Sequence, residues 1–178
     1  MQQEVNHIVG VEWFIDVVKN KLELIDLLKT KNWARPQNVN IEDRSNSVIY
    51  LMQKDSCPEA FNLVDDFRNS HLAKYRDIYN LPRLCYSSIE ALRYEVCEHY
   101  VEHFDNGSPH VANRICSMVT YLNDNYEGWE IEFPLFNASF KPSAGSVVVF
   151  PSNYQYLHTV KPVTSGSRYA LNVFFSYC

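Results

Sequence analysis

The pattern of apolar residues changes near Tyr86, and this change constrains the fold more than any other feature. From Tyr86 onward, short apolar runs alternate with residues that favour turns. The turn signals are Asn106-Gly107, Asn123-Asp124-Asn125, Pro142, Asn153 and Ser165-Gly166. Asparagine, glycine and proline at such intervals typically separate strands rather than helices. The pattern predicts a β-rich, barrel-like core over about residues 86–178.

The first 85 residues are predicted to contain helices. Asn20 is a candidate N-cap, and apolar residues follow it at nearly helical spacing, as expected for a helix that lies against a sheet: Leu22, Ile25, Leu28 and Trp33. The sequence Ser56-Cys-Pro-Glu59 has the form of a capping box and predicts a second helix over about residues 57–79. A strand is expected within residues 8–18, and a loop over residues 35–47.

Length and composition favour one domain. A chain of 178 residues with 46% hydrophobic residues can fill one core but not two of ordinary size. We therefore expect a single domain over residues 1–178, with a helical part over about 1–85 and a β core over about 86–178. The expected fold class is mainly β with N-terminal helices, or α+β.

The charge of the chain and its cysteines limit which binding partners and which cellular location the sequence favours. The net charge is −5, and the 16 lysines and arginines form no large cluster, which argues against nucleic-acid binding. No apolar run approaches the length of a membrane span, and no leader segment is visible at the N-terminus. The five cysteines are odd in number and form no CxxC pair, which favours reduced thiols and a cytoplasmic location.

Two histidines, an aspartate and an arginine are spaced as iron chemistry requires. His103 and Asp105 are two residues apart, so in an extended strand both side chains point to the same side. His158 lies in a second strand-like run, and Arg168 follows it after ten residues. Two imidazoles and one carboxylate can hold Fe(II) on one face and leave the other coordination positions open. We therefore predict a metal site formed by His103, Asp105 and His158.

The second half also resembles a known family, the 2-oxoglutarate- and Fe(II)-dependent dioxygenases, in their prolyl 4-hydroxylase-like branch. The resemblance covers about residues 86–176 and includes the stretches Leu92-Arg93-Tyr94, His99 to Asn106, Val119 to Asn123, Lys141 to Ser146, His158-Thr159-Val160 and Gly166 to Leu171. It implies a double-stranded β-helix, a cupin-like jelly roll, for the core. One departure is Trp129, which stands where that branch usually has a second glycine before the glutamate.

The resemblance implies the cosubstrates and their contacts. Fe(II), 2-oxoglutarate and O2 would take part, and ascorbate would support turnover by re-reducing the iron. Arg168 would pair with the distal carboxylate of 2-oxoglutarate together with Tyr121, and Tyr94 would reach the carboxylate nearer the iron. The expected reaction is hydroxylation of a prolyl residue in a peptide or protein, with release of succinate and CO2. Oxidation of a free amino acid or other small molecule stays open as the alternative.

Other functions fit these residues less well, and an iron-free jelly roll that only binds a ligand would be expected to lack one of the three metal ligands. His99-Tyr-Val-Glu-His103 fits the H-x-x-E-H pattern of inverted zincin peptidases, in which two histidines on a helix bind zinc and Glu102 acts as the base. Ser87 could cap such a helix, but this interpretation leaves His158 and Arg168 without a role. Repair of alkylated bases fits less well, because that branch has a second arginine where this chain has Phe174.

Overall fold

The protein is mostly β-structure, as predicted, with few helices. The computed structural model describes residues 8–178 except residues 16, 38, 52–56 and 129. The helical segments are α1 (Lys21–Lys29), α2 (Pro58–Phe67), the π-helix η2 (Arg68–Leu72), α3 (Ala73–Tyr79), and the short 3-10 turns η3 (Pro134–Phe136) and η4 (Tyr154–Tyr156). The strands are β1 (Glu12–Phe14), β2 (Ser47–Tyr50), β3 (Leu84–Tyr94), β4 (Tyr100–His103), β5 (Cys116–Tyr121), β6 (Ile131–Phe133), β7 (Ala138–Phe140), β8 (Val147–Pro151), β9 (His158–Val160) and β10 (Arg168–Tyr177).

The strands form two antiparallel sheets. The larger sheet has the order β1-β8-β5-β10-β3-β2, and the smaller one has the order β4-β9-β6-β7. The first 50 residues therefore contribute two strands, β1 and β2, to the edges of the larger sheet. The long strands β3 and β10 are neighbours inside this sheet and pair along almost their whole length.

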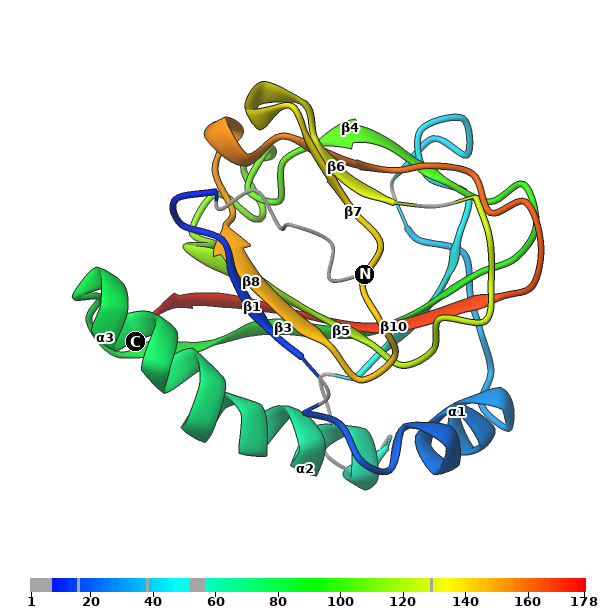
Figure 1. The fold of residues 1–178 in the computed structure, drawn as a ribbon, viewed down its shortest axis with the longest axis horizontal. Helices are drawn as coiled ribbons and strands as arrows, with labels where there is room; N and C mark the ends of the chain where they lie inside the picture. The colour runs from blue at the N-terminus through cyan, green and yellow to red at the C-terminus, as the bar shows by residue number, and fades with distance from the viewer. Residues whose placement is uncertain (1–7, 16, 38, 52–56, 129) are drawn as a thin grey trace, which may run out of the picture.

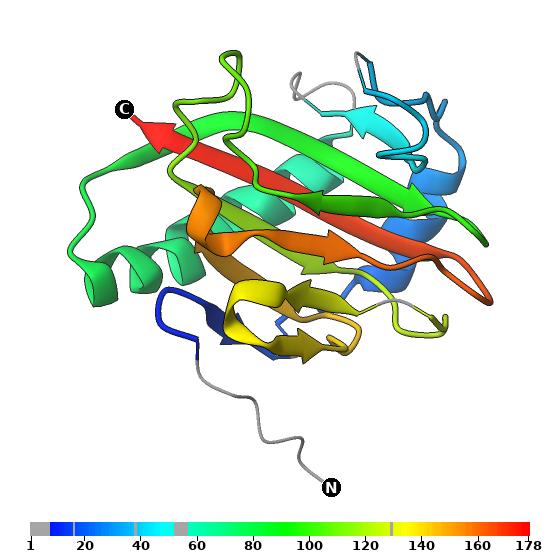
Figure 2. The same ribbon diagram turned by 90° about the horizontal axis from the view of Figure 1, so that it is seen from above.

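The molecule has three layers (Figures 1 and 2). The helices α1, α2 and α3 cover one face of the larger sheet, and the smaller sheet faces its other side. The strand β10 shows how the sequence produces both interfaces, because alternate side chains point to opposite faces. Leu171, Val173 and Phe175 pack in the core beneath the helices, whereas Ala170 packs in the core between the sheets. Arg168 lies on the same face as Ala170 and is buried between the sheets.

The predicted elements can be compared with those observed. A strand lies within residues 8–18 as expected, and residues 58–79 are helical without interruption, although the π-helix divides α2 from α3. Ser56 of the predicted capping box lies outside the described residues. Asn20 occupies the N-cap of α1, but its side chain makes no capping hydrogen bond. The placement of Leu22 against the sheet was wrong, since it is 68% exposed and Leu24 is buried instead.

The expectation of five reduced cysteines was also wrong. Cys85 and Cys178 form a disulfide across a sequence separation of 93 residues, while Cys57, Cys97 and Cys116 are free. The pairing follows from the sheet, because β3 and β10 run antiparallel and place residue 85 opposite Ser176. Spacing along the chain gives no sign of this proximity. Among the described residues, no helix is long and apolar enough to cross a membrane.

Candidate metal and cosubstrate site

Three side chains with metal-binding atoms meet where β4 and β9 pair. His103 is the last residue of β4 and stands directly opposite His158, the first residue of β9. Asp105 follows in the turn after β4, not within the strand as the spacing argument assumed. Its Oδ1 lies 3.5 Å from Nε2 of His103 and 3.8 Å from Nε2 of His158. The three ligand atoms all lie within 4.8 Å of one another.

Backbone contacts orient both imidazoles. Nδ1 of His103 lies 2.8 Å from the carbonyl oxygen of Val101, and Nδ1 of His158 lies 3.0 Å from that of Tyr156. A carbonyl can only accept a hydrogen bond, so each Nδ1 carries a proton and each Nε2 is the nitrogen directed at the cluster. Burial and the neighbouring His103 lower the pKa of His158 to about 4, so this ring is neutral at neutral pH.

The carboxylate of Asp105 is buried, and a hydrogen bond fixes its second oxygen, Oδ2. Its Oδ2 accepts a hydrogen bond from Oγ of Ser117 on β5, and Ser117 in turn lies 2.8 Å from Oγ of Ser152. Burial by itself would raise the pKa of Asp105, but His158, His103 and the Ser117 hydrogen bond outweigh it and hold the pKa well below its usual range. The group is therefore an anion, as a metal ligand must be.

A cavity joins the two histidines to Arg168. Its lining residues are Leu92, Tyr94, Tyr100, His103, Val119, Tyr121, Ile131, His158, Val160, Arg168 and Asn172. Arg168 is 2% exposed, and its guanidinium lies 4.8 Å from the ring centre of Tyr94 and 5.2 Å from that of Tyr121. Five of the six predicted site residues thus line one cavity, and the sixth, Asp105, lies against the two histidines.

Three tyrosines lie close enough to this arginine for its charge to act on their hydroxyls: Tyr94, Tyr121 and Tyr126. All three are buried, and burial raises the pKa of Tyr121 to about 12 and also raises the pKa values of Tyr94 and Tyr126. They are therefore neutral phenols that can donate hydrogen bonds. A fixed cation among neutral donors is an arrangement that suits a carboxylate.

The zinc peptidase interpretation is not supported. It requires a helix through residues 99–103, whereas the structure has the strand β4 from Tyr100 to His103. The ring of His99 instead contacts Oγ of Ser45 at 3.3 Å and the carbonyl oxygen of Glu42 at 2.9 Å. Glu102 is exposed. Consecutive side chains on a strand diverge, so this motif cannot gather its residues around one ion.

Sequence reasoning missed several residues around the site. Ser117 gave no signal, because a lone serine in an apolar strand is unremarkable. Tyr126 gave no signal of a role either, because a single tyrosine near a turn is usually a core or surface residue. Tyr100 lines the cavity and stacks on His103, with ring centres 3.4 Å apart and an angle of 12° between the planes. In a regular strand, residues three positions apart point to opposite faces. The sequence therefore gave no sign that Tyr100 contacts His103.

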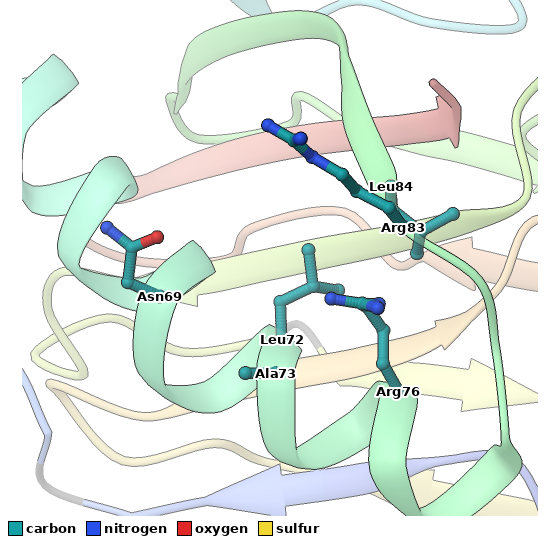
Figure 3. A pocket seen from close by; sticks show the side chains of 6 residues that line it. All are labelled: Asn69, Leu72, Ala73, Arg76, Arg83 and Leu84. Atoms are coloured by element: carbon teal, nitrogen blue, oxygen red, sulfur yellow. The ribbon is translucent and has the colours of Figure 1, made fainter.

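Another pocket lies where the π-helix, α3 and the start of β3 meet (Figure 3). Its described lining residues are Asn69, Leu72, Ala73, Arg76, Arg83 and Leu84, with Leu72 between the two arginines. None of these side chains is a metal ligand or a nucleophile. Nε of Arg76 already donates to the carbonyl oxygen of Pro82 at 2.8 Å. The side chains that can bind a metal lie instead beside the cavity at His103.

Comparison with known proteins agrees with this geometry. The model of the 2OG-Fe(II) oxygenase superfamily matches residues 89–176, a segment that contains the cluster and Arg168. This match supports the predicted resemblance to the 2-oxoglutarate- and Fe(II)-dependent dioxygenases. A putative prolyl 4-hydroxylase of Acanthamoeba polyphaga mimivirus is 30% identical over 115 residues, which cover 54% of this chain and 48% of that protein. This relative supports the predicted prolyl 4-hydroxylase-like branch of the superfamily. The chain spans about half the length of this curated relative.

Solved structures of oxygenases share the fold of the whole chain. The viral collagen prolyl hydroxylase vCPH of Paramecium Bursaria Chlorella virus-1, solved as a 2OG complex, superposes with a TM-score of 0.75 at 18% identity and covers 95% of this chain and 97% of that one. A prolyl hydroxylase from Trichoplax adhaerens, in complex with a hypoxia inducible factor peptide fragment, gives a TM-score of 0.74 at 17% identity, with 94% and 83% covered. At these identities the likeness is one of fold.

Proposed function

We propose that this protein is a 2-oxoglutarate- and Fe(II)-dependent dioxygenase that hydroxylates a prolyl residue in a peptide or protein. The observation that carries the proposal is the single cavity that joins His103 and His158 to Arg168. Neither the histidine pair nor the buried arginine would be as informative alone, since each of these features also occurs in proteins for structural reasons. Together they provide one place for a metal and one for the far carboxylate of a chelating dicarboxylate.

The described residues fit Fe(II). His103, Asp105 and His158 would supply two neutral nitrogens and one carboxylate oxygen, the donor set of non-haem iron oxygenases. Ser117 and the two backbone carbonyls hold these donors in place before a metal arrives. Bound Fe(II) supplies the redox chemistry that couples oxidation of 2-oxoglutarate by O2, giving succinate and CO2, to hydroxylation of the substrate.

The same residues fit the cosubstrate. Arg168 would pair with its distal carboxylate and Tyr121 would donate a hydrogen bond to it, while Tyr94 would reach the carboxylate nearer the iron. Tyr126 joins this set, because it also contacts Arg168. Burial of the guanidinium keeps water from competing for the ion pair, so the interaction is stronger than it would be on the surface. The protein thereby orients the cosubstrate and excludes water.

The prolyl substrate is inferred from relatives. The mimivirus relative is named a putative prolyl 4-hydroxylase, and the Trichoplax enzyme was solved with a peptide. We infer an open groove for an extended peptide beside residues 106–112 and Trp129, and Trp129 lies outside the described residues. The fold supports a further inference, that the two facing sheets are the double-stranded β-helix of this family and that residues 1–178 act as one domain.

The proposal is tested by turnover. Protein purified without oxygen is incubated with Fe(II), 2-oxoglutarate, ascorbate and O2, together with a panel of proline-rich peptides or with free proline. The expected result is a peptide that gains the mass of one oxygen atom in step with succinate release. Turnover of free proline alone would favour the small-molecule alternative. The proposal would be contradicted if no substrate led to succinate release and if Asp105→Ala did not differ from the wild type.

A further inference from the structure

The strand that carries His103 is irregular, and this irregularity creates the Tyr100–His103 stack. On β4, Tyr100 pairs with Val160 and His103 pairs with His158, so three steps along β4 correspond to two along β9. One extra residue on one strand is a β-bulge, which re-aims the side chains that follow it. Two residues three positions apart can then share a face, and the phenol ring lies nearly parallel to the imidazole.

The phenol ring of Tyr100 also contacts a cation. The guanidinium of Arg44 lies 4.9 Å from the ring centre of Tyr100. Arg44 is itself held, because its Nη2 lies 3.2 Å from the Glu90 carboxylate and its Nε donates to Oδ1 of Asn46 at 2.7 Å. The side chains of Arg44 and Glu90 are 11% and 7% exposed, so this ion pair is shielded from water. The result is a continuous series of contacts from Glu90 through Arg44 and Tyr100 to His103.

The segment that carries Arg44 is also tied to β4 by its backbone. The amide of Val101 donates to the carbonyl oxygen of Asp43 at 2.8 Å, and the amide of Ser45 donates to that of His99 at 3.1 Å. Arg44 and Tyr100 form a β-bridge between these two bonds. Residues 43–45 thus act as a short additional strand beside β4, although they lie far from it in sequence.

We propose that Arg44 and Tyr100 are positioning residues for the metal ligand His103. This inference rests on the proposed metal site. One hydrogen bond, from Nδ1 to the carbonyl oxygen of Val101, fixes a single point of the imidazole and allows the ring to tilt about it. A stacked phenol ring removes that tilt by fixing the ring plane, and Arg44 keeps the phenol ring in place. Nε2 of His103 therefore stays directed at Oδ1 of Asp105.

The proposal distinguishes the ring of Tyr100 from its hydroxyl. Tyr100→Phe keeps the stacked ring and removes the hydroxyl, whereas Tyr100→Leu keeps an apolar side chain and removes the ring. Loss of groups that orient metal ligands typically weakens metal binding by about 10- to 100-fold. We expect that loss for Tyr100→Leu, and a change of less than about threefold for Tyr100→Phe. Arg44→Lys keeps the charge beside Glu90 but not the planar stacking, so we expect an intermediate loss.

The measurement is a titration of metal-free protein with Co(II) under argon, followed through the visible bands of the bound ion and without any substrate. Thermal unfolding of the metal-free variants shows whether each one folds. Equal Co(II) affinity of wild type and folded Tyr100→Leu would overturn the proposal, as would an equal loss in Tyr100→Phe and Tyr100→Leu. Failure of the wild type to bind Co(II), or unchanged binding in Asp105→Ala, would instead contradict the metal site.

Discussion

At the scale of single residues, Arg168 shows how burial changes the role of a side chain. An arginine after a glycine turn is ordinarily exposed, yet this one is 2% exposed and faces the space between the sheets. Taking a cation out of water is costly unless polar groups compensate, and three phenols do so here. A carboxylate that bound beside this guanidinium and the three phenols would interact strongly with the cation, because little water competes for it.

Arg168→Ala should weaken 2-oxoglutarate binding without weakening iron binding. Loss of a charged hydrogen-bond partner costs about 1.5 to 3 kcal/mol, and more where a charge is left buried and unpaired. At about 1.4 kcal/mol per decade, this corresponds to a loss of roughly tenfold to a few hundredfold. Arg168→Lys should lose less, because it keeps the charge but not the paired geometry. Titration of the iron-to-keto-acid absorption band under argon measures this affinity. Unchanged affinity in Arg168→Ala would remove the case for a dicarboxylate at this position.

At the scale of elements, the antiparallel β4–β9 pair places the two imidazoles. Residues that stand directly opposite on antiparallel strands have Cβ atoms about 4.5 to 5.5 Å apart, which is close enough for two histidines to share one ion. His103 and His158 occupy such a pair, and the turn after β4 brings Asp105 back toward them. A helix through the same residues would have brought His99 to His103 and left His158 apart.

The strand and helix interpretations predict different effects of alanine substitutions on turnover. His103→Ala, Asp105→Ala and His158→Ala should each abolish iron-dependent turnover, because each removes one of three ligands. His99→Ala should keep turnover within a few-fold of the wild type, since its ring contacts Glu42, Ser45 and Cys97 and the backbone bonds between residues 43–45 and residues 99–101 remain. Succinate release at saturating Fe(II) is the measurement. Loss of activity in His99→Ala with retention in His158→Ala, or zinc-dependent peptide hydrolysis, would favour the peptidase interpretation.

At the scale of the whole molecule, the long pair β3 and β10 joins segments that are distant in sequence. Every other strand of the larger sheet pairs directly or indirectly with these two. The disulfide Cys85–Cys178 connects their adjacent ends and closes a loop that contains the whole smaller sheet. Closing a loop of this length restricts the unfolded chain strongly, so the crosslink should add stability.

Thiol counting tests the crosslink. Protein denatured without reductant should show three reactive thiols, from Cys57, Cys97 and Cys116, and reduced protein should show all five. Cys178→Ser should lower the free energy of unfolding by about 2 to 5 kcal/mol. Cys97→Ser is the matched control, because Cys97 is free and exposed. Denaturant unfolding without reductant compares the two variants. Five reactive thiols in the unreduced protein would show that the disulfide does not form.

The sequence alone determined what depends on local spacing. The turn residues after Tyr86 indicated a β-rich core, and the resemblance pointed to Tyr94 and Tyr121. The spacing argument selected His103 and Asp105, which the structure brings together, although Asp105 lies in the turn after β4 and not in the strand. Each of these inferences uses residues close together in the chain, or residues that fit a family motif. Side-chain direction within a strand is set by its period of two, so such information can be read without knowing the fold.

Only the tertiary structure decided which strands lie side by side and in what register. The disulfide between Cys85 and Cys178, the support of Asp105 by Ser117, and the contact of Arg44 with Tyr100 all join residues from different elements. Register between distant strands results from packing of the whole core, and a shift of one residue would turn every side chain to the opposite face. Local sequence carries no record of that choice, so it gave no sign of the contacts that Ser117 and Arg44 make beside the site.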